Sequence, residues 1–246
     1  MKRALLALAS ACSYFTVVPL GPLAAGPAPD AFALSYLPLV GAFVGAIAGT
    51  VGWFASLHVP HVVAAIAAWA CAVALTGAIH VDGFLDSCDG LLVTASVERR
   101  LEILRDPRHG TFAVVGMAML AAFWVAALAA IPPTHWIAFM AFSGTLARAA
   151  AVANAWRFPY ARAGAVTRAF ESRPNILVMA LVFAALVAAA RALGPAAVAS
   201  LVGALLFAQL AGWWASRRLG GGLTGDVYGA IVVVTEVLVL LAFSVH

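Results

Sequence analysis

Three aspartates lie close together in the segment HVDGFLDSCDGL, residues 80–91, of a chain that has few other acids. Asp82, Asp86 and Asp89 fall within eight positions, although all 246 residues include only ten Asp and Glu. Their i, i+4, i+7 spacing places the three carboxylates within about 60° on one helix face. Unpaired anions there would repel one another, whereas hard oxygen ligands suit Mg²⁺ or Mn²⁺, especially when a substrate phosphate completes the shell. The spacing therefore predicts a divalent-metal site.

The aspartates and the neighbouring His80 can each be interpreted in two ways. The aspartates also fit a solvated helix face paired with nearby arginines, but Glu98 and Glu102 lie closer to those arginines, which favours the metal hypothesis. His80 is a candidate base or ligand, or else a histidine satisfied at an interface. Gly83 and Gly90 carry no side chain, so we expect them to leave room for a large polar substrate.

Other charged residues extend the candidate site. Arg105 and Arg108 follow the cluster and can hold phosphate oxygens with bidentate geometry, although arginines also mark the cytoplasmic side of a membrane protein. Asp226 follows a glycine-rich turn, where it can cap a helix and where the helix start suits a phosphate. Arg148 and Glu236 lie inside apolar stretches, and we expect them to stabilise the bundle by pairing across helices, with each other as candidate partners, and not to take part in the chemistry.

Composition identifies the class of protein. Hydrophobic residues make up 65% of the chain, charged residues 10%, and the mean hydropathy is +1.03. A soluble domain is roughly half apolar and about a quarter charged. The chain is therefore an integral membrane protein, and its formal charge of +4 indicates orientation in the membrane, not nucleic-acid binding. Cys12, Cys71 and Cys88 match no zinc or disulfide pattern.

We expect an all-α, polytopic integral membrane bundle, with residues 1–246 forming a single domain. A spanning helix needs about 20 apolar residues, and about seven stretches meet that length. The N-terminal segment imitates a signal peptide, but polar and aromatic positions interrupt it, so we interpret it as an interfacial or re-entrant segment. The seven predicted spans are approximately 36–56, 60–79, 113–131, 135–155, 175–191, 196–215 and 226–243.

The connections between these stretches alternate in length and charge. Those after the first, third and fifth are short, whereas those after the second, fourth and sixth are longer and basic. By the positive-inside rule the basic side is cytoplasmic, and the C-terminus is then outside. Twelve of the fourteen Lys and Arg fall on that side: Lys2, Arg3, Arg99, Arg100, Arg105, Arg108, Arg157, Arg162, Arg168, Arg173, Arg217 and Arg218.

Several motifs resemble those of the cobalamin synthase family, the adenosylcobinamide-GDP ribazoletransferases. HVDGFLDSCDGLL and RRLEILRDPRHGT are similar to the family patterns H-x-D-G-x-x-D-x-x-D-G and R-D-x-x-x-G-T. FPYAR at 158–162, GGLTGD at 221–226 and YLPLVG at 36–41 also resemble family segments, so the likeness covers nearly the whole chain. The chain departs from the family at residues 15–19, FTVVP, where the family has an arginine.

The resemblance implies that the cobinamide-phosphate group of adenosylcobinamide-GDP is transferred to α-ribazole or its 5′-phosphate. GMP is released, and the nucleotide loop of adenosylcobalamin is completed. It implies a Mg²⁺-dependent enzyme, with Mn²⁺ as the alternative ion, in the bacterial inner membrane, with its active site facing the cytoplasm. The implied partners are these substrates and the lipid bilayer, without nucleic acid, and a homo-oligomer is left open.

The resemblance and the residue chemistry together select the candidate site residues. Those selected for catalysis are His80, Asp82, Asp86 and Asp89, of which the three aspartates also form the metal site, and those selected for substrate binding are Arg105, Asp106, Arg108, Thr111, Arg162 and Asp226.

Two other functions fit the sequence less well. A cation transporter would use the aspartates as its path, but transporter sites tend to lie near the membrane midplane between repeats, and no repeat is visible. A CDP-alcohol phosphotransferase catalyses a similar displacement on lipids. Its usual alanine–arginine pair after the first D-G-x-x is absent, because Asp86 and Ser87 follow Leu85.

Overall fold

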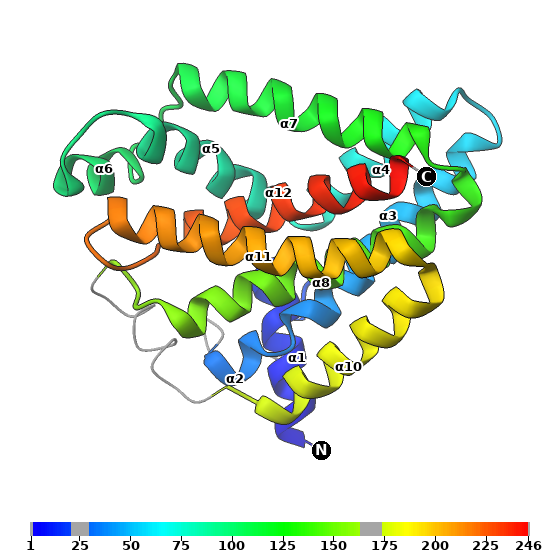
Figure 1. The fold of residues 1–246 in the computed structure, drawn as a ribbon, viewed down its shortest axis with the longest axis horizontal. Coiled ribbons are helices and arrows are strands. Elements are labelled where there is room, and N and C mark those ends of the chain that lie inside the picture. Colours follow the sequence, from blue (N-terminus) through cyan, green and yellow to red (C-terminus); the bar gives the residue numbers. More distant parts are fainter. Residues whose placement is uncertain (1, 21–29, 163–173, 246) are drawn as a thin grey trace.

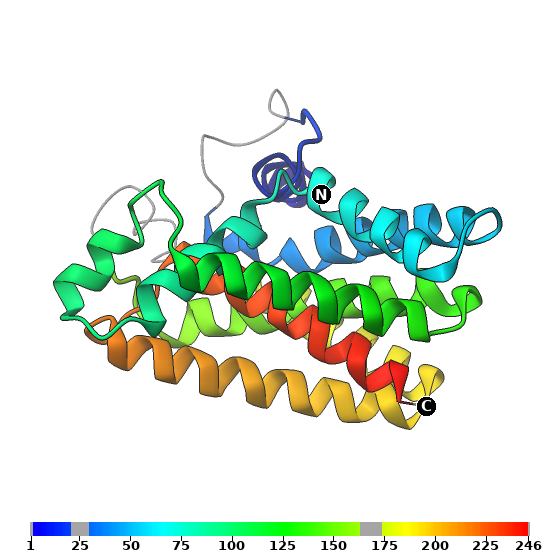
Figure 2. The ribbon, with the colours of Figure 1, turned by 90° about the horizontal axis from the view of Figure 1, so that it is seen from above.

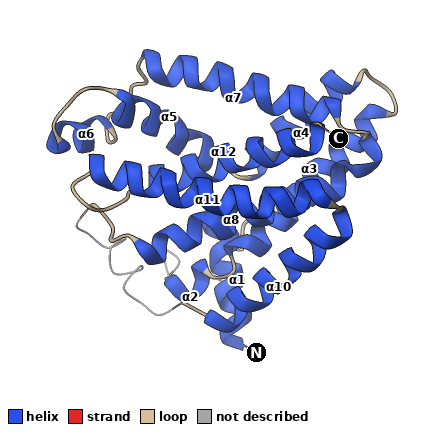
Figure 3. Ribbon diagram, viewed as in Figure 1, coloured by secondary structure: helices blue, strands red, loops and turns tan. Residues whose placement is uncertain are grey.

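The computed structural model describes residues 2–20, 30–162 and 174–245, and its regular structure is helical (Figure 3). In these ranges the only β-type pairing is one isolated bridge between Tyr160 and Leu223. The all-α prediction is therefore confirmed. The helices are α1 (Lys2–Phe15), α2 (Ala31–Leu34), α3 (Leu37–Ser56), α4 (His61–Leu75), α5 (Ile79–Leu92), α6 (Val97–Ile103), α7 (Thr111–Ala130), the 3₁₀ turn η2 (Pro133–His135), α8 (Trp136–Arg157), α10 (Ile176–Leu193), α11 (Pro195–Arg218) and α12 (Gly225–Ser244).

Six of the described helices are long and apolar enough to cross a membrane. They are α3, α7, α8 with η2, α10, α11 and α12, and each matches a predicted span to within a few residues. The polytopic membrane bundle is thus confirmed, with six spans, or seven if α4 and α5 together count as one.

The second predicted span, 60–79, was wrong as a single straight helix. The helix α4 ends at Leu75, α5 begins at Ile79, and the two axes differ by 92°. Gly77 and Ala78 both have left-handed backbone conformations, with φ of 57° and 60°, which a right-handed helix cannot contain. Hydropathy did not detect this break, because the residues from α4 to Ile79 are mostly apolar or small. As a result, α5 is directed away from α4 and carries the acidic motif on a separate short helix.

Close packing of α3 against α8 forms one half of the bundle. A Cβ atom on Gly41 would lie 2.1 Å from the carbonyl oxygen of Gly144, and one on Gly45 would lie 2.2 Å from that of Met140. Small residues at four-residue spacing allow two membrane helices to approach this closely, so dispersion contacts extend along the helix pair. These glycines therefore fix the α3–α8 interface.

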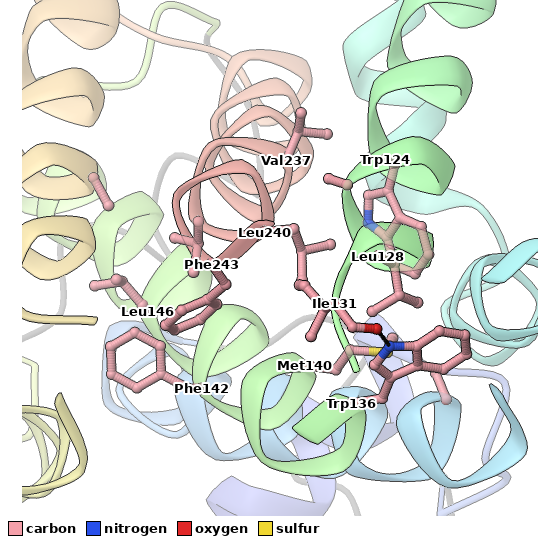
Figure 4. Packing of buried hydrophobic residues seen from close by; sticks show 14 of the residues in the cluster. Trp124, Leu128, Ile131, Trp136, Met140, Phe142, Leu146, Val237, Leu240 and Phe243 are labelled. Atoms are coloured by element: carbon pink, nitrogen blue, oxygen red, sulfur yellow. Dashed lines mark hydrogen bonds between the residues drawn. The ribbon is translucent and has the colours of Figure 1, made fainter. Parts of the chain in front are cut away.

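The helix α12 lies at the centre of the other half and contacts α5, α7, α8 and α11. Its lower part packs Phe243 against Phe142, with ring centroids 5.9 Å apart (Figure 4). Nearby, the fully buried Trp136 donates its indole N–H to the carbonyl of Ile131 at 2.8 Å, which satisfies the polar edge of the ring (Figure 4). This core holds α12 in place between the site and the opposite end of the bundle.

The N-terminal helix α1 runs across the direction of the long helices and lies on the outside of the bundle (Figures 1 and 2). At 14 residues it is shorter than the roughly 20 that a span requires. It packs on α2 and α3, and the N–H of Val17 donates to the carbonyl of Leu75 at 2.8 Å. This placement agrees with the predicted interfacial segment.

The connections separate to the two ends of the bundle, as the alternation in the sequence predicts. The chain leaving α5, α8 and α11 is at one end, and the connections after α3, α7 and α10 are at the other, together with the C-terminus (Figure 1). Arg168 and Arg173 lie outside the described residues. The described basic loops therefore share one end with the acidic motif.

Candidate active site

The acidic motif lies on α5, which is helical throughout Ile79–Leu92, as its spacing predicts. Asp82 is exposed, and Asp86 and Asp89 are partly buried. In the part of the chain that the structure describes, the Asp82 side chain has no hydrogen-bond or ion-pair partner. Its carboxylate is therefore available to a ligand.

The helix α12 crosses α5 beside this motif. A Cβ atom on Gly83 would lie 2.8 Å from the carbonyl oxygen of Asp226, and one on Gly229 would lie 3.1 Å from that of His80. A Cβ atom on Gly90 would lie 2.6 Å from the side chain of Leu104. The expectation that Gly83 and Gly90 leave room for substrate was therefore wrong, because other parts of the chain fill that space.

This crossing brings Asp226 to the acidic motif. Asp82 and Asp226 line one cavity, and Asp86 lies one helical turn from Asp82, so we call Asp82, Asp86 and Asp226 the acidic group. Arg162 is its cationic neighbour, with Nη2 2.8 Å from Asp226 Oδ2. The imidazole of His109, which is charged only when protonated, places Nδ1 3.8 Å from Asp86 Oδ1.

Arg162 reaches Asp226 because two distant loops pair with each other. The N–H of Ala161 donates to Leu223 at 2.7 Å, and the N–H of Leu223 donates to Pro159 at 2.9 Å. Arg162 also donates to the carbonyl of Leu104 at 2.9 Å, which connects the end of α6 to the same place. The pairing places Arg162 between the ends of α6 and α8 and the start of α12.

Asp226 does not cap α12. The N-cap position is Thr224, which makes no side-chain cap hydrogen bond, and Asp226 lies in the first turn of the helix. Its carboxylate is paired with Arg162 instead. A carboxylate in the first turn also interacts favourably with the helix dipole.

Asp89 belongs to a different interaction. Its carboxylate accepts hydrogen bonds from the backbone N–H groups of Gly110 and Ala113, the latter at 3.0 Å, at the start of α7. It therefore attaches α5 to α7 in the manner of a helix cap. No group of three His, Cys, Asp or Glu side chains within the described ranges is arranged to hold a metal ion. Asp89 thus hydrogen-bonds to α7, whereas Asp82 and Asp86 form no such bond in the described structure, and the three-aspartate metal site stays a prediction.

The basic loop after α6 contains both free and paired side chains. Arg108 forms an ion pair with Asp106 at 2.7 Å, and its hydrogen bonds hold the pKa of Asp106 down to about 2. Arg105 is exposed and has no partner among the described residues. Thr111 is exposed as the first residue of α7. The loop therefore offers Arg105 and Thr111 to a ligand, whereas Asp106 and Arg108 satisfy each other.

Several arginines have structural partners, as the topological interpretation expects. Arg100 is buried and donates to the carbonyls of Gly90 and Leu91 at 3.0 and 2.8 Å, which satisfies the C-terminal end of α5. Arg99 pairs with Glu102 at 2.8 Å on the surface. These contacts fix the shape of the loop, and they engage Arg99 and Arg100 with groups other than Asp82, Asp86 and Asp226.

The pairing predicted for Arg148 and Glu236 is confirmed. Arg148 on α8 donates to the carboxylate of Glu236 on α12, and their side chains are 4% and 16% exposed. The pair bridges the two helices. A charge inside a membrane bundle is tolerable when it has a partner of this kind.

A cavity of about 290 Å³ opens beside the acidic group. It lies between the end of α1, the starts of α3, α5 and α12, and the end of α8, and both Asp82 and Asp226 line it. His80 is also in its wall. The cavity is therefore lined by two of the predicted site residues, Asp82 and Asp226, and otherwise mostly by apolar side chains.

Sequence reasoning did not select some residues that the fold brings to this place. His109 lies in the RDPRHGT stretch and Tyr160 in FPYAR, so the motifs contained a signal for both. Tyr14 and Phe15 line the cavity from the N-terminal segment, where residues 15–19 match the family pattern only in part and did not select these two rings. Their place depends on how α1 packs on the bundle.

Comparison with known proteins agrees with the motif pattern. The sequence model of the family described as cobalamin-5-phosphate synthase matches residues 7–244. Relatives named adenosylcobinamide-GDP ribazoletransferase also match, and three of them show the extent of the similarity. The one from Deinococcus radiodurans is 37% identical over 97% of this chain and 86% of its own length. Those from Roseiflexus sp. (strain RS-1) and Pseudomonas aeruginosa (strain PAO1) are 33% and 32% identical over 96% and 99% of this chain, and 88% and 100% of their own.

No solved structure matches the chain. The family match covers nearly all of the residues, including α5, the basic loop and the start of α12 that together form the site. The chain belongs to the cobalamin-5-phosphate synthase family.

Proposed function

We propose that this protein transfers the cobinamide-phosphate group of adenosylcobinamide-GDP to α-ribazole, or to its 5′-phosphate, and releases GMP. One observation carries the proposal: Asp82, Asp86 and Asp226 gather beside a cavity, with Arg162 adjacent, in a chain whose relatives are named for this reaction. Transfer of a phosphate-linked group from a pyrophosphate to a hydroxyl needs cations for the phosphates and a group that accepts the hydroxyl proton. Both kinds of group are present.

The names of the relatives favour this reaction over the two alternatives from the sequence. A cation transporter and a CDP-alcohol phosphotransferase would each use an acidic cluster, but the relatives with 32–37% identity are named as ribazoletransferases. Asp226 also lies in the first turn of α12 and pairs with Arg162 of the loop after α8, so the acidic group adjoins the described basic loops, whereas transporter sites tend to lie near the membrane midplane.

The reaction exchanges one phosphorus–oxygen bond for another. A ribose hydroxyl oxygen of the acceptor bonds to the phosphorus that carries cobinamide, and the bond from that phosphorus to the bridging oxygen of GMP breaks. The hydroxyl proton passes to a carboxylate of the acidic group, and GMP leaves with the bridging oxygen. His80 lines the same cavity and stays a predicted catalytic residue.

The residues present fit a divalent cation that the substrate helps to hold. Mg²⁺ is usually bound by one or two carboxylates together with substrate phosphates, and Asp82 has an unengaged carboxylate one helical turn from Asp86. Asp82 and Asp86 would hold the ion, with Asp89 occupied elsewhere. When bound, a divalent cation neutralises charge on the pyrophosphate.

The cations of the site bind and orient the donor. Arg105 and Thr111 are exposed at the end of α6 and the start of α7, and they would contact the pyrophosphate oxygens. Arg162 is held by Asp226, so its guanidinium is already positioned when the substrate arrives. Asp106 would act by holding Arg108 in place.

We also place the protein in the bacterial inner membrane with the site facing the cytoplasm. The support is the arginine bias, because the described basic loops lie at the same end of the bundle as the acidic group (Figure 1). The large polar substrates would then enter without crossing the bilayer.

The direct test is release of GMP by purified full-length protein in liposomes supplied with adenosylcobinamide-GDP and α-ribazole. We expect turnover with Mg²⁺ and its loss after chelation, with recovery when Mg²⁺ or Mn²⁺ is returned. Release that is absent with either form of the acceptor contradicts the reaction. Release that is unchanged by chelation contradicts only the metal requirement.

A further inference from the structure

The cavity beside the acidic group has aromatic walls that the reaction described above does not use. The rings of Tyr14, Phe15, Tyr160 and Tyr228 line it from three separate segments, since Tyr14 and Phe15 both lie at the end of α1. On α8 its wall consists of small side chains, including Ala151 and Ala155. Aromatic rings that enclose a space of about 290 Å³ suit a flat ligand that can stack.

One polar group in this wall is buried without a partner. His80 is 6% exposed, and its Nε2 has no hydrogen-bond partner among the described residues. The ring of Phe15 stacks on it, with centroids 5.9 Å apart and planes at 26°. A buried unpaired ring nitrogen is costly, so a ligand with a ring nitrogen of its own would be favoured here once Phe15 shifts to admit it.

The cavity also has a fixed relation to the reacting groups. Asp82 and Asp226 line it together with the aromatic rings. A nucleoside whose base enters the cavity therefore presents its ribose near the carboxylates. This is where the nucleophilic hydroxyl has to be for the proposed transfer.

We propose that this cavity holds the heteroaromatic base of the acceptor, α-ribazole, with the ribose directed toward Asp82 and Asp226. This inference rests on the proposed function and adds which substrate occupies which part of the site. The base of α-ribazole is a fused bicyclic ring with one unsubstituted ring nitrogen, which suits walls that are mostly apolar.

The other parts of the substrates fit less well. Small-molecule sites range from about 300 to 1,000 Å³, and a cavity of about 290 Å³ is too small for a corrin ring with its side chains. Guanine carries hydrogen-bonding groups around its whole edge, and mostly apolar walls would leave several of them unpaired. The corrinoid and GMP portions therefore lie outside the cavity, toward the basic loops.

Two substitutions that change the cavity in opposite directions test the assignment. Ala155→Leu fills it, and Phe15→Ala enlarges it and removes the stacking ring. With the full chain in liposomes, Ala155→Leu should raise the KM for α-ribazole by roughly ten-fold or more, and Phe15→Ala by roughly three- to ten-fold. The KM for adenosylcobinamide-GDP should stay the same in both. Calorimetry with α-ribazole alone should show the same losses in affinity.

A base of different size supplies a test that does not depend on any variant folding. A naphthimidazole riboside, with three fused rings, should be used at least roughly ten-fold less well than α-ribazole by the unaltered protein, because the cavity limits the base. Phe15→Ala should narrow that difference. Phe54→Ala, which removes an exposed ring from the far end of α3, is the matched control and should change neither KM nor the preference.

Different outcomes separate this inference from the proposed function. A raised KM for adenosylcobinamide-GDP, with an unchanged KM for α-ribazole, would assign the cavity to guanine and overturn the inference. Equal use of the bicyclic and tricyclic bases by the unaltered protein would also overturn it. In either case GMP would still be released, whereas absence of GMP release would contradict the proposed function itself.

Discussion

At the scale of single residues, the three aspartates of α5 have different partners. Asp82 is unengaged, Asp86 faces His109, and Asp89 accepts two backbone hydrogen bonds at the start of α7. The i, i+4, i+7 spacing predicts one shared role, but Asp226 takes the third position in the acidic group. Within this one motif, we therefore assign Asp82 and Asp86 to the chemistry and Asp89 to the support of the structure.

We expect Asp82→Asn and Asp86→Asn to reduce GMP release by a hundred-fold or more while the protein still folds. Each substitution keeps the shape of the side chain and removes a charge that would hold a cation and stabilise the transition state, an effect on the order of several kcal/mol. The measurement is turnover at saturating Mg²⁺ in liposomes. Near-normal turnover by either variant would contradict the assignment.

Asp89→Asn is the matched comparison from the same helix. It weakens the cap on α7, so we expect a lower thermal midpoint together with a smaller loss of turnover than at the other two positions. A loss as large as that of Asp82→Asn, at unchanged stability, would place Asp89 in the chemistry after all.

At the scale of elements, two contacts hold the helices that support the site. The glycines of α3 allow α8 to approach, and Arg148 on α8 pairs with Glu236 on α12. Together they connect α3, α8 and α12, and α12 in turn positions Asp226 against α5. The site therefore depends on packing distant from it.

We expect Arg148→Ala and Glu236→Ala each to destabilise the protein, by about 3–5 kcal/mol, because each leaves a buried partner unpaired. The double variant should lose less than the sum of the two losses. Thermal unfolding in detergent measures this, with Arg191→Ala, an exposed arginine of α10, as the control. Strictly additive losses would mean that the two side chains do not interact.

The α3–α8 interface makes a second prediction at this scale. In Gly45→Ala the new Cβ would lie 2.2 Å from the carbonyl oxygen of Met140, so the helices must move apart, and we expect a loss of about 1–3 kcal/mol. Gly203→Ala on α11 is the control, because nothing lies within 4 Å of its Cβ position. A thermal midpoint lowered equally in both variants would argue against close packing as the cause.

At the scale of the whole molecule, the site adjoins the described basic loops, which gather at one end of the bundle (Figure 1), because Arg162 of the loop after α8 pairs with Asp226. Orientation in the membrane therefore decides which compartment supplies the substrates. The positive-inside rule assigns this end to the cytoplasm.

Cysteine labelling in intact cells tests that orientation, in a chain whose Cys12, Cys71 and Cys88 have been replaced. We expect Ala95→Cys, between α5 and α6, to resist an impermeant thiol reagent until the membrane is opened. Val59→Cys, between α3 and α4 at the other end, should react from outside at once. The reverse pattern would invert the topology and move the active site out of the cytoplasm.

The sequence by itself determined the class of the protein and most of its helices, and it selected several residues of the candidate site. Apolar runs of about 20 residues predict spans because backbone polar groups in lipid must be satisfied within a helix, and six of the seven predicted stretches became long helices. The sequence also pointed to Asp82 and Asp86 by their spacing. It pointed to Arg148 and Glu236 because charge is rare and costly inside membrane spans.

Only the tertiary structure decided where the chain bends and which distant groups meet. The break at Gly77 and Ala78 is a matter of backbone dihedrals within an apolar run, and hydropathy does not sense it. Asp226 replaces Asp89 in the acidic group because α12 crosses α5 at two glycines, and the paired loops bring Arg162 to it. These contacts join residues far apart in sequence, so they depend on helix packing, which local periodicity does not encode.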